Sequence, residues 1–281
     1  MSTTKIEWTD VTWNPIIGCH KISRGCDHCY AERMANRISH MNNHAGEMYN
    51  KVITNGKWNG KTLFADHLLN YPSMLKKPKK IFVGSMTDIF LHSQSKQGRL
   101  DVIKLFSAMA MHPQHTFQIL TKRPVAMKIF IDSMERINMK WPLPNVWLGV
   151  TVCDQDDANF RIPILLDTPA VCRFISIEPM LSKIDLTYMP LAGSDYIING
   201  LTGIFTSPHN NMRFMGLDWV IVGGETGPGA REMKPEWAYQ IQQQCETSST
   251  PLFFKKWGSH KNTTSLDRIP SLIDTFKEFP G

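Results

Sequence analysis

Long apolar runs are missing from this chain of 281 residues. No stretch of 18 apolar residues occurs, so no membrane-spanning helix is expected. Residues Met1 to Pro15 include Glu7 and Asp10, where a secretory signal peptide would need an unbroken apolar stretch. Internal repeats, low-complexity tracts and linkers between domains are also absent. We therefore expect a soluble cytoplasmic protein that folds as a single domain over residues 1–281.

No strong excess of either charge is present. The chain has 31 Lys and Arg against 25 Asp and Glu, a net charge of 31 − 25 = +6, and its isoelectric point is about 9.0. Apolar residues make up 42% and charged residues 20%, which excludes a disordered or fibrous protein. A charge of +6 over a surface of this size gives a weak field, which suits an anionic partner without requiring one.

Cysteine is scarce, and half of the six cysteines lie in one short segment. Cys153, Cys172 and Cys245 are scattered through apolar stretches, where a free cysteine is most often a small core residue. The other three follow the pattern Cys19-x6-Cys26-x2-Cys29. An odd number of clustered thiols in a cytosolic chain of this size argues against a disulfide framework. Such clusters usually hold a metal.

Two kinds of metal site fit the clustered cysteines. In a zinc site, Cys26 and Cys29 would supply one ligand pair, and His20 or His28 would join Cys19. A structural zinc site usually takes a second pair from a separate segment, however, and no such pair follows. The alternative is an iron–sulfur cluster on three thiolates, with one iron left for another ligand. S-adenosylmethionine chelates such an open iron in radical enzymes.

Short β-branched and apolar runs recur along the chain, each followed by polar or glycine-rich residues and then by a helical pattern. Continuous apolar runs bounded by turns are typical of strands in a buried parallel sheet. Seven strands are predicted, at residues 11–17, 81–83, 117–120, 146–150, 174–177, 219–222 and 252–254. Repeated strand–helix units in this order predict an α/β fold built as a parallel β/α barrel, complete or partial.

Helices are predicted between these strands. One helical pattern begins at Tyr30, directly after the clustered cysteines, which places the cysteines at the end of the first strand and favours the iron–sulfur cluster. Apolar side chains recur at helical spacing in residues 102–109 and 127–134. Pro124 and Pro235 stand where the first turns of two helices are expected.

Two segments interrupt the alternation of strands and helices. Residues 40–79 are rich in Asn, His, Met and Gly, which predicts an insertion with a short helix of its own. Residues 187–215 contain several glycines and predict a second insertion, which forms a hairpin or a lid. Tyr196, Phe205 and Phe214 within it are candidates to stack on a nucleic-acid base, although aromatic residues in a lid more often pack it.

Functional side chains of a β/α barrel gather at the carboxyl ends of its strands. Glycine there lets a ligand approach the backbone, a carboxylate suits an ammonium or ribose hydroxyl, and Lys or Arg suits a carboxylate or phosphate. The candidate cofactor-binding residues after the predicted strands are Gly84, Ser85, Met86, Thr87, Asp88, Thr121, Lys122, Thr151, Ser176, Glu178, Gly223, Gly224 and Glu225. No catalytic residue is assigned.

Three basic groups are candidate contacts for phosphate. The lysines of residues 76–80 precede a predicted strand, and the simplest interpretation is that they lie in a solvent-exposed segment that leads into it. Lys122 and Arg123 follow one strand, and Lys255–Lys256 ends the last. If the substrate is a nucleic acid, these groups are expected to supply its affinity.

Several motifs in combination resemble a known family. They are Trp13-Asn14-Pro15, the cysteine run from Gly18 to Ala31, Ser85 to Phe90, Leu120 to Pro124, Ile175 to Pro179 and Gly223 to Arg231. Together they resemble the phage-associated, three-cysteine radical-SAM-like family, described as a domain of unknown function, over nearly the whole chain. One departure is that the usual radical SAM loop is Cys-x3-Cys-x2-Cys with an aromatic residue before the last cysteine. Here the first gap is six residues and His28 holds that position.

The resemblance implies a partial β/α barrel of the radical SAM type. Cys19, Cys26 and Cys29 would hold a [4Fe-4S] cluster, and the open iron would bind S-adenosylmethionine. One electron, from a donor of the flavodoxin or ferredoxin type, would cleave this cofactor to methionine and a 5′-deoxyadenosyl radical, which abstracts hydrogen from the substrate. The resemblance does not distinguish between an isomerase, a lyase and a transferase.

The same resemblance, with the basic charge, indicates the partners. A phage setting points to the host cytoplasm and to a modified base in DNA or RNA, altered or repaired by the enzyme. The turn Gly84 to Thr87 would line the methionine amino end of the cofactor. Ser176, Glu178 and the stretch Gly223 to Glu225 would line its ribose and adenine. The rival hypothesis is a zinc-stabilised nucleic-acid-binding protein without catalysis.

Overall fold

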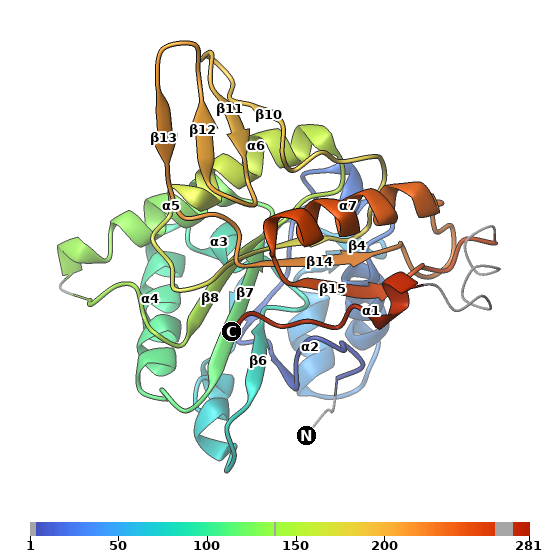
Figure 1. The fold of residues 1–281 in the computed structure, drawn as a ribbon. Coiled ribbons are helices and arrows are strands. Elements are labelled where there is room, and N and C mark those ends of the chain that lie inside the picture. The colour runs from blue at the N-terminus through green and yellow to red at the C-terminus, as the bar shows by residue number, and fades with distance from the viewer. Residues whose placement is uncertain (1–3, 138, 262–271) are drawn as a thin grey trace. The chain divides into compact units, whose positions relative to one another are not determined.

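The computed structural model describes residues 4–137, 139–261 and 272–281. The fold is mixed α/β, and its seven parallel strands follow the order β1-β6-β7-β8-β9-β14-β15 (Figure 1). The α/β class and the parallel sheet predicted from the sequence are therefore confirmed. The chain divides into two compact units, residues 1–147 and 148–281, and the division falls within β8.

The parallel strands of the first unit are short and mostly buried. They are β1 (Val11–Trp13), β6 (Lys80–Val83), β7 (Thr116–Thr121) and the first residues of β8 (Val146–Thr151). Ile81 is paired with Val11 on one side and Phe117 on the other. Both Ile81 and Phe117 are fully buried, as expected for strands with apolar side chains on both faces.

The predicted first strand, residues 11–17, is in fact two strands in two different sheets. The parallel sheet keeps β1 only as far as Trp13. Ile16–Ile17 forms β2, which pairs antiparallel with β5 (Leu63–Phe64). Pro15 lies between them, and because proline has no backbone N–H it cannot continue the hydrogen-bond ladder. The prediction of one continuous strand is wrong for this reason.

The described residues of the first unit form five α-helices. They are α1 (Tyr30–Ser39), α2 (His44–Asn50), α3 (Ile89–His92), α4 (Lys96–Ala110) and α5 (Pro124–Asp132). The predicted pattern in 102–109 is confirmed, because Val102, Leu105, Phe106 and Met109 are all buried on one face of α4. Pro124 occupies the first turn of α5, also as predicted.

The segment 40–79 has its own small core. It contains α2, the hairpin of β3 (Ile53–Thr54) and β4 (Lys57–Trp58), and β5. Val52 and Ala65 are buried in a cluster that also includes Ile17 and Ala35. The segment therefore packs on the residues that flank the clustered cysteines, Ile17 before them and Ala35 of α1 after them.

The second unit repeats the pattern of parallel strands and helices. Its elements are β8, α6 (Gln155–Leu166), β9 (Arg173–Ile177), β14 (Trp219–Gly223), α7 (Pro235–Ser248) and β15 (Leu252–Lys256). Cys153, Cys172 and Cys245 are buried, which confirms the prediction that they are core residues. Across the described parts of the chain, no helix combines the length and apolarity that crossing a membrane would require.

The segment 187–215 of the second unit forms a separate antiparallel sheet. Its strands are β10 (Met189–Pro190), β11 (Ile197–Asn199), β12 (Ile204–Thr206) and β13 (Asn211–Arg213). In Figure 1 this sheet, in orange, stands beside α6. Phe205 is buried, and its ring centroid lies 4.7 Å from that of Phe214. The antiparallel pairing of these strands agrees with the hairpin expected for the segment.

The close approach of β8 and β9 makes a prediction at Gly149. A Cβ atom there would lie 2.7 Å from ring carbons of Phe174. Because protein interiors are close-packed, we expect Gly149→Ala to lower the free energy of unfolding by about 1–3 kcal/mol, measured by urea denaturation. Gly223→Ala is the control, since its Cβ would meet its nearest neighbours at an ordinary 3.5 Å. Equal losses in the two variants would contradict the packing explanation.

Candidate functional site

The three clustered cysteines lie on one loop of the first unit, which we call the cysteine loop (residues 18–29). It runs from β2 to the start of α1, and Cys29 is the residue that caps α1. Gly18 begins the loop with a φ of +95°, a conformation that favours glycine. A Cβ atom at Gly18 would also clash with the carbonyl oxygen of Lys61. The chain is therefore forced into this turn immediately before Cys19.

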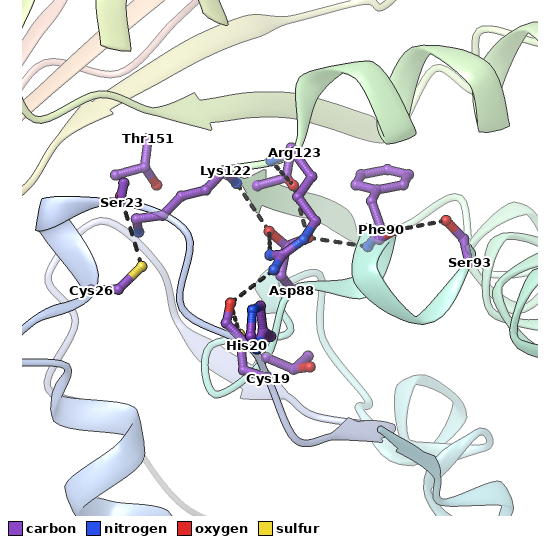
Figure 2. A network of polar contacts seen from close by, with 12 residues as sticks. Cys19, His20, Ser23, Cys26, Asp88, Phe90, Ser93, Lys122, Arg123 and Thr151 are labelled. Carbon is purple, nitrogen blue, oxygen red and sulfur yellow. Dashed lines mark hydrogen bonds and ion pairs between the residues drawn. The ribbon is translucent and has the colours of Figure 1, made fainter. Parts of the chain in front are cut away.

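The donor atoms of the cysteine loop are available but are not gathered into a finished metal site. Cys19, Cys26 and Cys29 are partly exposed, and none is in a disulfide. Within the described residues, no group of three or more His, Cys, Asp or Glu side chains is arranged to hold a metal ion. Instead, the Cys26 sulfur lies 3.8 Å from the hydroxyl of Ser23 (Figure 2). Three thiols on one loop suit an iron–sulfur cluster by their chemistry, but the thiols would have to converge.

The environment of Cys19 favours its protonated form. Burial, followed by the nearby negative charge of Asp88, raises the pKa of the Cys19 thiol to about 12. The guanidinium of Arg123 acts in the opposite direction but does not outweigh burial. A metal that binds here would therefore have to displace a tightly held proton.

Cys26 has the opposite tendency. Its partial burial works against ionisation, but the ammonium of Lys122 and hydrogen bonds from Ile22 and Ser23 outweigh burial and lower the pKa of its thiol. Lys122 follows β7, so a strand end far away in the sequence supplies this positive charge. Cys26 is consequently the more readily ionised of these two thiols.

The turn after β6, residues 84–88, packs against the cysteine loop. Gly84 has a φ of +77°, and its N–H donates to the carbonyl of Trp13 at 2.8 Å. The Oδ1 atom of Asn14 accepts hydrogen bonds from the Ser85 hydroxyl and from the Met86 N–H, each at 3.2 Å. Gly84, Ser85 and Met86, which are predicted to bind the cofactor, therefore make hydrogen bonds that attach this turn to Trp13 and Asn14.

Two more hydrogen bonds tie this turn to the two ends of the cysteine loop. The hydroxyl of Thr87 donates to the carbonyl of Gly18, directly before Cys19. The hydroxyl of Tyr30 donates to the carbonyl of Ser85 at 2.9 Å, directly after Cys29. The turn therefore anchors the loop on both sides of its cysteines.

Asp88 accepts four hydrogen bonds through its side chain (Figure 2). Its side chain is 7% exposed. Its Oδ1 accepts from the Phe90 N–H at 3.2 Å and from the Thr121 hydroxyl at 2.8 Å. Its Oδ2 accepts from the Lys122 N–H and from the Arg123 guanidinium, both at 3.0 Å. Both carboxylate oxygens are thus engaged by the protein.

The candidates of the second unit lie at or just after the carboxyl ends of β8, β9 and β14. Thr151 and Ser176 are paired residues of β8 and β9 and are buried. Glu178 accepts a hydrogen bond from the ammonium of Lys255 at 2.6 Å and is partly exposed. Gly223 lies against both side chains, and a Cβ there would be 3.5 Å from each. Glu178, Lys255 and Gly223 therefore lie together at the strand ends.

Glu225 closes the glycine-rich turn that follows β14. Its Oε2 accepts from the N–H and the Nε of Arg231, at 2.8 and 2.9 Å, and its Oε1 accepts from Nη2 at 2.6 Å. The side chain of Glu225 is 5% exposed. Both of its carboxylate oxygens accept hydrogen bonds from Arg231, and these bonds stabilise the turn.

Three residues with central roles are not among the predicted cofactor or metal ligands, although Arg123 is among the candidate phosphate contacts. Asn14 and Tyr30 hold the turn after β6, and Arg123 joins Asp88 to the cysteine loop through the carbonyl of His20. A signal for them existed, because each lies in a motif that carries the family resemblance. Their partners could not be read from the sequence, since these hydrogen bonds join residues at least 55 positions apart.

The site is thus a thiol-bearing loop fastened to the carboxyl ends of parallel strands in an α/β protein. A family model described as "Protein of unknown function (DUF5131)" matches residues 3–274, and the chain belongs to this family. The family description assigns no activity. No curated protein and no solved structure matches the chain.

The contrast between Cys26 and Cys19 makes a prediction for the metal-free protein. Iodoacetamide at pH 8 should alkylate Cys26 faster than Cys19, because only thiolates react and the pKa of Cys26 is the lower. Lys122→Gln removes the ammonium and raises the pKa of Cys26, so its alkylation should slow by about three- to tenfold. Lys128→Gln, which removes a lysine paired with Asp132, is the control. Mass spectrometry of the labelled peptides measures both rates, and an unchanged rate in Lys122→Gln would refute the assignment.

Proposed function

We propose that this protein is a radical S-adenosylmethionine enzyme with a [4Fe-4S] cluster on Cys19, Cys26 and Cys29. The observation that carries the proposal is that one loop presents three partly exposed thiols, none in a disulfide, beside the ends of β1 and β6. Ligands of parallel α/β proteins bind at these strand ends. The proposal includes a partial barrel of the radical SAM type.

The donor set fits this cluster in number and chemistry. Three thiolates would ligate three irons, and the fourth iron would remain for the amino and carboxylate groups of S-adenosylmethionine. When bound, the cluster would supply the electron that cleaves the sulfonium of S-adenosylmethionine. Because the described residues hold no gathered group of metal-ligating side chains, the three thiols of the cysteine loop would have to move closer together as the cluster binds.

The chain's own residues would prepare this site in two ways. Lys122 places a positive charge beside Cys26, and this charge would stabilise the negative charge of a thiolate-ligated cluster. The positive φ of Gly84 lets the backbone after β6 turn toward the loop, where it can line the methionine end of the cofactor.

Among the candidates of the second unit, Glu178 is the carboxylate best suited to a ribose hydroxyl. One of its oxygens accepts from Lys255, and its side chain is 22% exposed. Glu225 is less suited, because Arg231 engages both of its oxygens. We therefore propose Glu178 rather than Glu225 as the ligand-contacting acid.

Iron loading tests the cluster directly. Alanine at Cys19, Cys26 or Cys29 should reduce iron loading strongly, because each thiolate would ligate one iron, whereas wild type should bind about four iron and four sulfide. Anaerobic reconstitution followed by iron and sulfide analysis measures this. Alanine at Cys153, Cys172 or Cys245 is the control and should affect packing alone.

Cleavage of S-adenosylmethionine is measured separately from iron loading. Reduced, cluster-loaded protein should release 5′-deoxyadenosine from S-adenosylmethionine, slowly even without its substrate.

Full iron content in the Cys26→Ala variant would overturn the cluster assignment. A colourless wild-type protein with one zinc would instead support the non-catalytic zinc protein.

We further propose a base in DNA or RNA as the substrate, with the target base extruded or single-stranded so that it can reach the site. The net charge of +6 supports this class. The exposed Lys76 and Lys77 precede β6, however, whereas the cysteine loop meets the turn that follows it. The lysines and the turn lie beyond opposite ends of β6, whose four residues span about 13 Å. These lysines would contact phosphates away from the reacting base.

Salt dependence tests the nucleic-acid substrate. Affinity for single-stranded oligonucleotides should fall steeply with salt, because phosphate contacts release counterions. Replacing both Lys76 and Lys77 with Gln should flatten the log–log slope by about 1.4, which corresponds to two lost contacts at 0.7 each. Fluorescence anisotropy across a salt series measures this slope. Binding that is absent at low salt, or indifferent to salt, would move the substrate to the small-molecule class.

A further inference from the structure

The first residues of the cysteine loop are held from both sides of Cys19. On one side, Gly18 forms a backbone bridge with Thr87 and accepts a hydrogen bond from its hydroxyl. On the other side, the carbonyl of His20 accepts a hydrogen bond from Nη2 of Arg123 at 2.8 Å. The backbone of Cys19 is thus fastened to the turn after β6 and to the end of β7.

Arg123 makes this second attachment by bridging two acceptors. Its Nη1 donates to Oδ2 of Asp88 at 3.0 Å while its Nη2 reaches His20 (Figure 2). The side chains of Arg123 and Asp88 are 9% and 7% exposed, so solvent screens the pair little. A planar guanidinium presents donors in a fixed fork, which a lysine ammonium cannot reproduce.

Further hydrogen bonds hold both residues of the Asp88–Arg123 ion pair. Asp88 caps α3 through the Phe90 N–H and also accepts from the Thr121 hydroxyl of β7. The backbone of Arg123 is held as well, because its N–H donates to the same Thr121 hydroxyl at 2.9 Å and α5 begins at the next residue. The Asp88 carboxylate and the Arg123 backbone are therefore both held by hydrogen bonds that do not involve the guanidinium.

We propose that Asp88 and Arg123 are positioning residues that set the place of Cys19 through the carbonyl of His20. In this role neither side chain contacts the ligand, although the position of Asp88 after β6 makes it a natural candidate for a cofactor contact. Their effect is to hold the backbone next to Cys19 beside the carboxyl ends of β6 and β7 before any cluster binds. This inference rests on the proposed function only for its consequence, because the attachment itself can be measured without iron.

The test uses a variant that removes the bridge without leaving a buried charge alone. The double variant Asp88→Asn/Arg123→Gln keeps an amide at each position, and Asn still caps a helix. Gln is too short to reach His20 from this backbone. The single variant Arg123→Lys keeps the positive charge but not the fork.

The second unit supplies a matched control. Arg161 bridges the carboxylate of Asp157, at 2.6 Å, and the backbone carbonyl of Thr151, just as Arg123 bridges a carboxylate and a carbonyl. Its side chain is 5% exposed. The variant Asp157→Asn/Arg161→Gln therefore loses the same kind of buried bridge, but in the other unit of the chain.

Hydrogen exchange of the iron-free protein reads the attachment. In Asp88→Asn/Arg123→Gln, peptides covering residues 18–23 should exchange about tenfold faster or more, because a charge-assisted hydrogen bond no longer opposes local opening. Arg123→Lys should accelerate the same peptides, and Asp157→Asn/Arg161→Gln should leave them unchanged. Unchanged exchange in the first variant, or equal acceleration in the control, would overturn the proposal.

Iron per folded chain reads the consequence. After anaerobic reconstitution, the Asp88→Asn/Arg123→Gln variant should hold less than half the wild-type iron, and the reduced cluster should give an altered electron paramagnetic resonance spectrum. The Asp157→Asn/Arg161→Gln control should match wild type in both. Wild-type iron and spectrum in the first variant would refute the positioning role. If wild type itself takes up no iron, the proposed function fails while the exchange result still decides the attachment.

Discussion

A single buried carboxylate, that of Asp88, holds the candidate site together. Left alone, a buried charge of this kind would be strongly destabilising. Here the Arg123 guanidinium neutralises it, and the Phe90 and Lys122 N–H groups and the Thr121 hydroxyl fill its remaining acceptor positions. Because these donors come from α3, β7 and the start of α5, satisfying one charge fixes three elements of the first unit relative to one another.

The cysteine loop depends on the same arrangement. Arg123 passes the attachment from Asp88 to the carbonyl of His20, and the turn after β6 adds the Thr87 and Tyr30 hydrogen bonds at the two ends of the loop. Polar residues at the strand ends are therefore of two kinds. Some build the support for the loop, and others, such as Lys122 beside Cys26, direct a charge at a thiol.

Much of the fold could be read from the sequence because its strands are buried on both faces. Six of the seven predicted strands lie in the sheet within one or two residues of their expected ends. The remaining predicted strand, residues 11–17, is wrong in its extent because Ile16 and Ile17 are as apolar as a central strand but pair with β5 after Pro15. Residues 187–215 were harder, since the short strand β13 is fully exposed and carries no apolar alternation.

The sequence by itself determined which residues are candidates for the site. It separated the three clustered thiols from the three core cysteines and identified the polar residues at the strand ends. These follow from spacing and hydropathy, which are local properties of the chain. Only the tertiary structure decided which polar residue serves which partner. Asp88 meets Arg123 across 35 positions, and Arg123 meets His20 across 103. No periodicity encodes such pairs, because they exist only once parallel strands bring their carboxyl ends to one edge and a buried charge must be satisfied there.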